Sequence, residues 1–170
     1  MKKVIRFFSA AIVMIAFTAN VNAQSATALA SATIVTPITL TWVSDMNFGN
    51  VGVNAVGGTV DMTPAGGRTA NGGCFLPAVT GTVTAGAFTV GGSAAATYSI
   101  TLPAGALTIS NGAINMTVDT WTSTPTPTGT IGGGGTQSLT IGGTLHVAGS
   151  QAPGLYTSAA PGFTVTVNYN

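Results

Sequence analysis

The chain has 170 residues, of which 45% are hydrophobic and only 4% are charged. Three of its four cations lie within the first six residues, so the remainder has one cation, Arg68, against Asp45, Asp61 and Asp119, a formal charge of −2. This balance excludes nucleic-acid binding, because neutralising phosphates requires several Lys or Arg side chains.

The N-terminus has the organisation of a secretory signal peptide. Residues 2–6 carry positive charge, residues 7–17 are apolar, and residues 21–23 supply small or apolar residues at the expected cut. We predict cleavage after Ala23, so that residues 1–23 are the signal peptide. The apolar stretch is too short to span a membrane. We therefore expect a mature chain without a membrane span, exported across the inner membrane to the periplasm, the cell surface or an extracellular fibre.

The composition after residue 23 favours strands over helices. Lys and Glu are absent there, Gly and Thr are abundant, and no segment offers the straight-chain residues that build exposed helix faces. Strand-like runs alternate with glycine pairs at short spacing, which is typical of an all-β sandwich. The single cysteine, Cys74, allows no intrachain disulfide. We expect an N-terminal extension, residues 24–32, and one domain, residues 33–170, held together by packing.

The clearest strand pattern lies in the last eight residues. Apolar and polar side chains alternate there, which places Phe163, Val165, Val167 and Tyr169 on one buried face. A long loop is predicted for residues 123–135, which contain two prolines and five glycines. The predicted strands are residues 34–42 (interrupted near Pro37), 58–62, 81–84, 87–90, 97–102, 106–109, 115–121, 137–141, 144–148 and 163–170.

Candidates for catalysis are few. His146 is the only base of suitable pKa, and without a local motif it reads as an exposed strand histidine. Cys74 has no neighbour in sequence that would stabilise a thiolate, so it reads as a small buried or loop cysteine. Asp45, Asp61 and Asp119 are too scattered to predict a metal site. We expect no enzymatic activity, no metal and no cofactor.

The remaining side chains of note have competing interpretations. We predict that Arg68 pairs with Asp61 across a turn. Trp42 and Trp121 could form a platform that stacks on carbohydrate, but their alternate placement in strands favours burial in the core.

The lack of charge leaves the predicted sheet edges unguarded, because soluble sheet proteins usually protect edges with Lys. Either the fold hides these edges, or another chain pairs with them by strand addition.

Several short motifs, taken in order, resemble a family of uncharacterised secreted bacterial β-sandwich domains over residues 33–170. That family is similar to spore-coat-U-like proteins and to chaperone–usher fimbrial subunits. The motifs are Asp45-Met46-Asn47-Phe48-Gly49, Gly66-Gly67-Arg68-Thr69, Phe88-Thr89-Val90, residues 97–103, Gly142-Gly143-Thr144-Leu145, and the ending from Gly154 through Tyr169.

The resemblance implies an immunoglobulin-like (pilin-like) antiparallel Greek-key sandwich that is completed by a strand from a chaperone and then from the next subunit. Tyr169 matches the penultimate aromatic residue of the fimbrial C-terminal strand, whereas Thr157 stands where those subunits carry a glycine. The implied partners are copies of the chain or sister subunits, a periplasmic chaperone and an usher.

Two functions remain open at this point. The first is a non-enzymatic structural subunit of a surface fibre or coat, assembled by strand addition. The second is a monomeric binding module that recognises a glycan or an envelope protein through loops around Arg68 and residues 123–135.

The segment that would be donated for assembly is residues 24–32. Ala26, Ala28, Ala30 and Ala32 share one face of an extended strand, and Ile34 continues the same phase. The predicted assembly residues are therefore these five together with Phe163, Val165, Val167 and Tyr169. A disordered leader, or a first strand that pairs within its own domain, is the alternative.

Overall fold

A computed structural model describes residues 23–170, so the predicted signal peptide lies outside the described residues except for Ala23. The chain divides between Thr33 and Ile34 into two units. Residues 24–33 are exposed and form no strand. No helix in the described residues is long and apolar enough to cross a membrane.

The unit that begins at Ile34 is all-β, as predicted, and its strands form antiparallel sheets in a sandwich. The strands are β1 (Thr39–Ser44), β2 (Gly52–Met62), β3 (Arg68–Phe75), β4 (Gly86–Gly91), β5 (Thr97–Thr101), β6 (Leu107–Asn111), β7 (Ile114–Thr124), β8 (Thr128–Thr130), β9 (Thr136–Val147), β10 (Thr157–Ser158) and β11 (Thr166–Tyr169).

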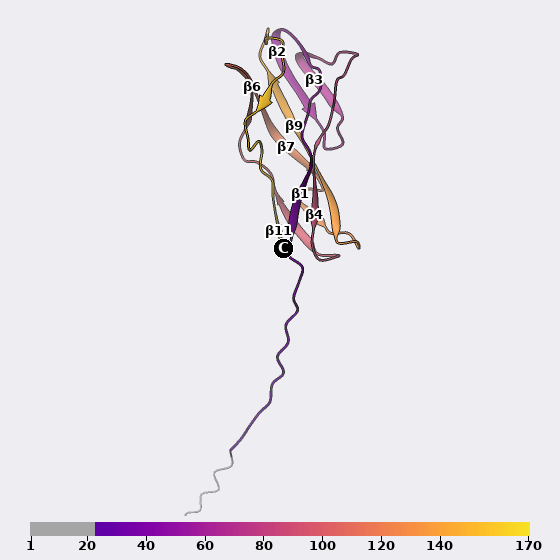
Figure 1. The fold of residues 1–170 in the computed structure, drawn as a ribbon, viewed down its shortest axis with the longest axis vertical. Coiled ribbons are helices and arrows are strands. Elements are labelled where there is room, and N and C mark those ends of the chain that lie inside the picture. The colour runs from indigo at the N-terminus through magenta and orange to yellow at the C-terminus, as the bar shows by residue number, and fades with distance from the viewer. Residues whose placement is uncertain (1–22) are drawn as a thin grey trace, which may run out of the picture. The chain divides into compact units, whose positions relative to one another are not determined.

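The larger sheet has the order β1-β4-β9-β7-β6-β10, and β2 joins it by pairing with both β9 and β3. The smaller sheet has the order β11-β5-β8. Within this unit β2 and β3 lie side by side at one end, and β1, β4 and β11 lie at the other (Figure 1).

Strand β9 changes its neighbour midway along its length. Residues Thr136–Ile141 pair with β4, whereas residues 143–147 pair with β2 on the same side. Gly142 stands at the change, where an added Cβ would lie 2.2 Å from the carbonyl oxygen of Met62. Gly142-Gly143 therefore allows a close backbone approach inside one strand, and the predicted separate strands 137–141 and 144–148 are parts of the single strand β9.

The core has two parts, and β9 contributes to both. Its Leu145 and Val147 belong to the first cluster, with Phe48, Val60, Met62, Cys74 and Val118. Its Leu139 and Ile141 belong to the second cluster, with Val90, Tyr98, Ile131, Val165 and Val167. Trp121 packs against both clusters, because a bulge in β7 between Asp119 and Thr122 interrupts the register there.

Strand positions were predicted better than strand ends. The predicted strand 34–42 begins only at Thr39, because Pro37 cannot donate to a ladder. Residues 81–84 form no strand and contribute only an isolated bridge, Asn47 to Thr84. Strands β3, β8 and β10 are not among the predicted strands, because their residues are rich in Gly, Asn, Thr and Ser, which give no clear strand signal.

The prediction that residues 123–135 form a solvated loop is wrong in part. It contains β8, which pairs with β5. Ile131, which follows β8, is only 1% exposed and belongs to the second core cluster.

Replacing Ile131 by Ala should therefore destabilise the protein by about 2–5 kcal/mol, because it removes buried methyl groups and leaves a cavity. Urea unfolding should show a lower midpoint with an unchanged slope. Val79→Ala is the control, because Val79 is 75% exposed, and its effect should stay within about 0.5 kcal/mol. Equal effects of the two changes would contradict the placement of Ile131 in the core.

Candidate functional site

The outward face of the β2-β9-β7 sheet is polar. Cross-strand partners lie on the same face, so Asp61, Thr144 and Asp119 form one row across these strands. The adjacent row consists of Thr59, His146 and Thr117. Asp61 and Asp119, two of the three aspartates in the sequence, therefore share one face with His146, the only histidine.

Side-chain hydrogen bonds connect this polar face. The Nε2 atom of His146 lies 2.8 Å from Oδ1 of Asp119, and both side chains are partly exposed. Asp61 accepts hydrogen bonds from Thr144 Oγ1 and from Asn71 Nδ2, each at 2.8 Å. The predicted exposure of His146 is confirmed. The side chain bonded to it is a carboxylate, an acceptor and not a nucleophilic hydroxyl.

The hydrogen bond from His146, and then that from Thr120, lower the pKa of Asp119 below its ordinary value. Both bonds favour the charged carboxylate, while the slight burial of this side chain opposes them. Asp119 therefore stays ionised to lower pH than a solvated aspartate.

Strands β7 and β9 separate at one end of this face. Their pairing stops at Thr117 and His146. Beyond that point Asn115 and Met116 pair with β6, while Val147 pairs with Gly58 of β2. We call the gap between residues 115–117 and 146–148 the β7–β9 wedge.

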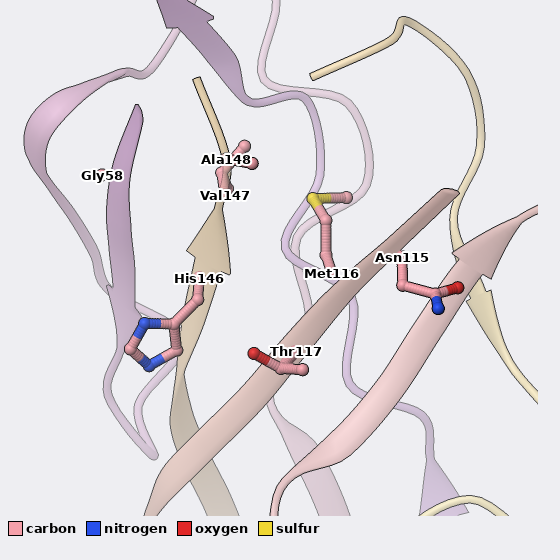
Figure 2. A pocket seen from close by; sticks show the side chains of 7 residues that line it. All are labelled: Gly58, Asn115, Met116, Thr117, His146, Val147 and Ala148. Atoms are coloured by element: carbon pink, nitrogen blue, oxygen red, sulfur yellow. The ribbon is translucent and has the colours of Figure 1, made fainter. Parts of the chain in front are cut away.

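The wedge forms a hollow of about 350 Å³ that is largely open to solvent and that Gly58 also lines. His146 on β9 and Thr117 on β7 lie on its two sides (Figure 2). Val147 belongs to the first core cluster, and Met116 packs against it. The wedge therefore has an apolar floor beneath the polar face. The Asn115 carbonyl oxygen accepts a hydrogen bond from Gln151 Nε2 at 3.2 Å.

Arg68 does not pair with Asp61, contrary to our prediction. Arg68 is the partner of Met62 across β2 and β3, whereas Asp61 is the partner of Thr69, so the two charged side chains lie on opposite faces. The Arg68 guanidinium donates to the carbonyl oxygens of Phe48 and, at 3.0 Å, of Asn50. The cation therefore holds the loop before β2.

The two tryptophans have different environments. Trp121 is partly buried, contacts the Phe163 ring at 4.8 Å between centroids, and donates from Nε1 to the Gly105 carbonyl oxygen. Trp42 is 61% exposed, so its predicted burial is wrong. Cys74 is buried, which matches our interpretation, and its burial raises the pKa of the thiol.

The exposure of Trp42 comes from an open side of the sandwich. Its partner on β4 is Phe88, and the neighbouring pair is Leu40 with the fully buried Val90, so Leu40 and Trp42 lie on the inward side of β1. Strand β1 pairs only with β4, and β11 pairs only with β5, among the strands within residues 23–170. We call the side bounded by the outer edges of β1 and β11 the β1/β11 seam.

The predicted assembly residues fall in two places. Val165 and Val167 belong to the second core cluster, and Phe163 and Tyr169 pack against it. The Tyr169 hydroxyl accepts from the Ser93 N–H and donates to the Thr36 carbonyl oxygen, both at 2.7 Å. The other five residues, Ala26, Ala28, Ala30, Ala32 and Ile34, are exposed and in no strand.

Residues 38–169 match the family described as a domain of unknown function (DUF4402), and the chain belongs to this family. No curated protein matches the chain, and no solved structure matches it. The expected membership of an uncharacterised domain family is thus confirmed. Its finer relation to spore-coat-U-like proteins and fimbrial subunits stays a prediction.

The lowered pKa of Asp119 gives a testable pH dependence. A carboxyl group with a depressed pKa in the folded state contributes stability above its unfolded pKa, near 3.8, and loses this stability as the pH falls through the folded pKa. In His146→Ala, a carboxyl-detected NMR titration should show the pKa of Asp119 rising toward 3.8. Thr144→Val is the control, because it removes a bond to Asp61 only. An unchanged Asp119 titration in His146→Ala would contradict this assignment.

Proposed function

We propose that this protein is a non-enzymatic structural subunit of an extracellular fibre or coat, assembled by adding a strand of one copy to the sandwich of the next. The observation that carries the proposal is the β1/β11 seam. There two neighbouring sheet edges lack strand partners among the described residues, and the inward-facing Trp42 is exposed.

The seam has the chemistry that an added strand requires. An extended segment gains main-chain hydrogen bonds at a sheet edge, and its alternate side chains enter the space between the sheets. A strand beside β11 would extend the three-stranded sheet and cover the inward side of β1. Burial of the Trp42 ring would then supply most of the apolar contribution, because an aromatic side chain buries 150–250 Å².

The proposed donor is residues 24–32 of another copy, continued to Ile34. These residues are exposed and form no strand, so their backbone groups are available for a sheet ladder. The four alanines on one face are small, and Ile34 is the one large aliphatic residue in phase with them. Small side chains suit a position beside Val165 and Val167, because both are already buried in the second core cluster.

The seam also lacks the usual protection against pairing. Strands β1 and β11 contain no charged residue. Asp45, which directly follows β1, accepts a hydrogen bond from Nε1 of Trp42 at 3.0 Å, which orients the ring at the edge. An uncharged edge of this kind is a template for another strand.

Deleting residues 24–32 from the secreted chain should leave a folded domain that does not polymerise. Size-exclusion chromatography and electron microscopy should show assemblies or filaments for the intact chain and monomers for the deletion. A peptide of residues 24–36 added to the deletion variant should shift the tryptophan emission to shorter wavelength, because it buries Trp42. The same assembly state for both chains would refute donation by this segment.

A pair of neighbouring substitutions locates the acceptor. Trp42→Ser should prevent assembly, whereas Val43→Ser should not, because Val43 is similarly exposed but lies on the opposite face of β1. Equal losses from both substitutions would place the contact outside the seam, and no loss from either would contradict the seam as the acceptor.

A further inference from the structure

The β7–β9 wedge is a second candidate site, and the proposed assembly does not use it. Its floor is apolar, formed by Met116 and by Val147, and its rim is polar, formed by Thr117, His146 and Asn115. Small-molecule sites typically combine an apolar surface with a few polar groups that fix orientation. The hollow, at about 350 Å³ and largely open to solvent, is large enough to contact one face of a compact ligand unit.

The rim offers both kinds of hydrogen-bonding group. The Thr117 hydroxyl donates and accepts, the Asn115 side chain carries an amide, and His146 adds an imidazole whose Nε2 atom contacts Asp119. The Asp119 carboxylate beside the ring is partly exposed and accepts hydrogen bonds. These groups suit a ligand with several hydroxyls.

The electrostatics of this face disfavour an anion. Asp61 and Asp119 lie on it, and the only cation after residue 23, Arg68, lies on the opposite face of β3 and binds two backbone carbonyls. A phosphate or carboxylate would therefore meet negative charge without a compensating cation. A fully apolar ligand would leave the polar rim unpaired.

We propose that the wedge binds a neutral saccharide unit. One C–H face of the sugar ring packs on Met116 and Val147, and its hydroxyls exchange hydrogen bonds with Thr117, Asn115 and His146. This differs from the recognition predicted through Arg68 and residues 123–135, because Arg68 is committed to the loop and Ile131 to the core. The site is independent of the assembly proposed above.

Saturation-transfer NMR with the full chain tests this proposal, since it works with monomers and with large assemblies. The probes are D-glucose, D-galactose, N-acetyl-D-glucosamine and, as a cationic comparator, ethanolamine. We expect saturable transfer to at least one sugar with a Kd on the order of 1 mM. No transfer to any of the three sugars would overturn the proposal, as would transfer to ethanolamine alone.

Substitutions at the rim assign the signal to the wedge. Thr117→Val and His146→Gln are conservative changes at accessible positions, and each should weaken sugar binding about two- to tenfold through loss of a hydrogen bond. Thr108→Val is the matched control, because Thr108 is the partner of Thr117 on β6, on the same face but outside the wedge. Trp42→Ser removes the other exposed candidate for sugar stacking. Binding that survives both rim changes, or that is lost in Trp42→Ser with the rim intact, would overturn the assignment to the wedge.

Discussion

The rest of the structure depends on a single strand that serves two cores. β9 places Leu139 and Ile141 in one cluster and Leu145 and Val147 in the other. It can do so only because Gly142 lets the chain after β2 pass at a distance that no side chain would permit. Along one side β9 pairs first with β4 and then with β2, and along the other it pairs with β7. The seam lies where β1 and β11 each have no further strand partner among the described residues, and the wedge lies where β7 and β9 stop pairing.

The few charged side chains form hydrogen bonds within the domain, and none of them lies on the edge strands β1 and β11. Arg68 donates to two carbonyl oxygens, Asp61 accepts from Thr144 and Asn71, and Asp119 contacts His146. A protein with more charge would place some of it on β1 or β11 to prevent pairing with other chains. Here the strands of the seam are uncharged, while the polar face carries a connected hydrogen-bond network. The two surfaces therefore suit different partners: a backbone at the seam, and a hydroxylated ligand at the wedge.

The sequence was sufficient for the fold class and for most strand positions, because alternation and the scarcity of helix formers are local signals. The predicted strand 163–170 illustrates this. The strand, β11, begins only at Thr166 and ends at Tyr169, but the predicted alternation is present, since Val165 and Val167 are buried and Thr164 and Thr166 are exposed. The failures have non-local causes. The pair Gly142-Gly143 indicates a break between strands unless the approach of Met62 is known. Arg68 is near Asp61 in the sequence, but the register places the two side chains on opposite faces. The wedge could not be predicted from the sequence for the same reason, because Thr117 and His146 are neighbours only through the register of β7 and β9.

The two proposed sites occupy different ends of the domain, and this separation has a functional consequence. The seam lies at the end of β1, β4 and β11, whereas the wedge lies where β9 has left β4 and pairs with β2 (Figure 1). A strand added at the seam would therefore leave the wedge of every subunit accessible. A fibre of such subunits would present many copies of a weak site, and the effective concentration of neighbouring sites raises overall avidity without any new contact. A Kd on the order of 1 mM for one wedge is then compatible with firm attachment of the fibre to a polysaccharide surface. Monomers released by deleting residues 24–32 would keep the site but lose that attachment, which separates the role of assembly from the role of recognition.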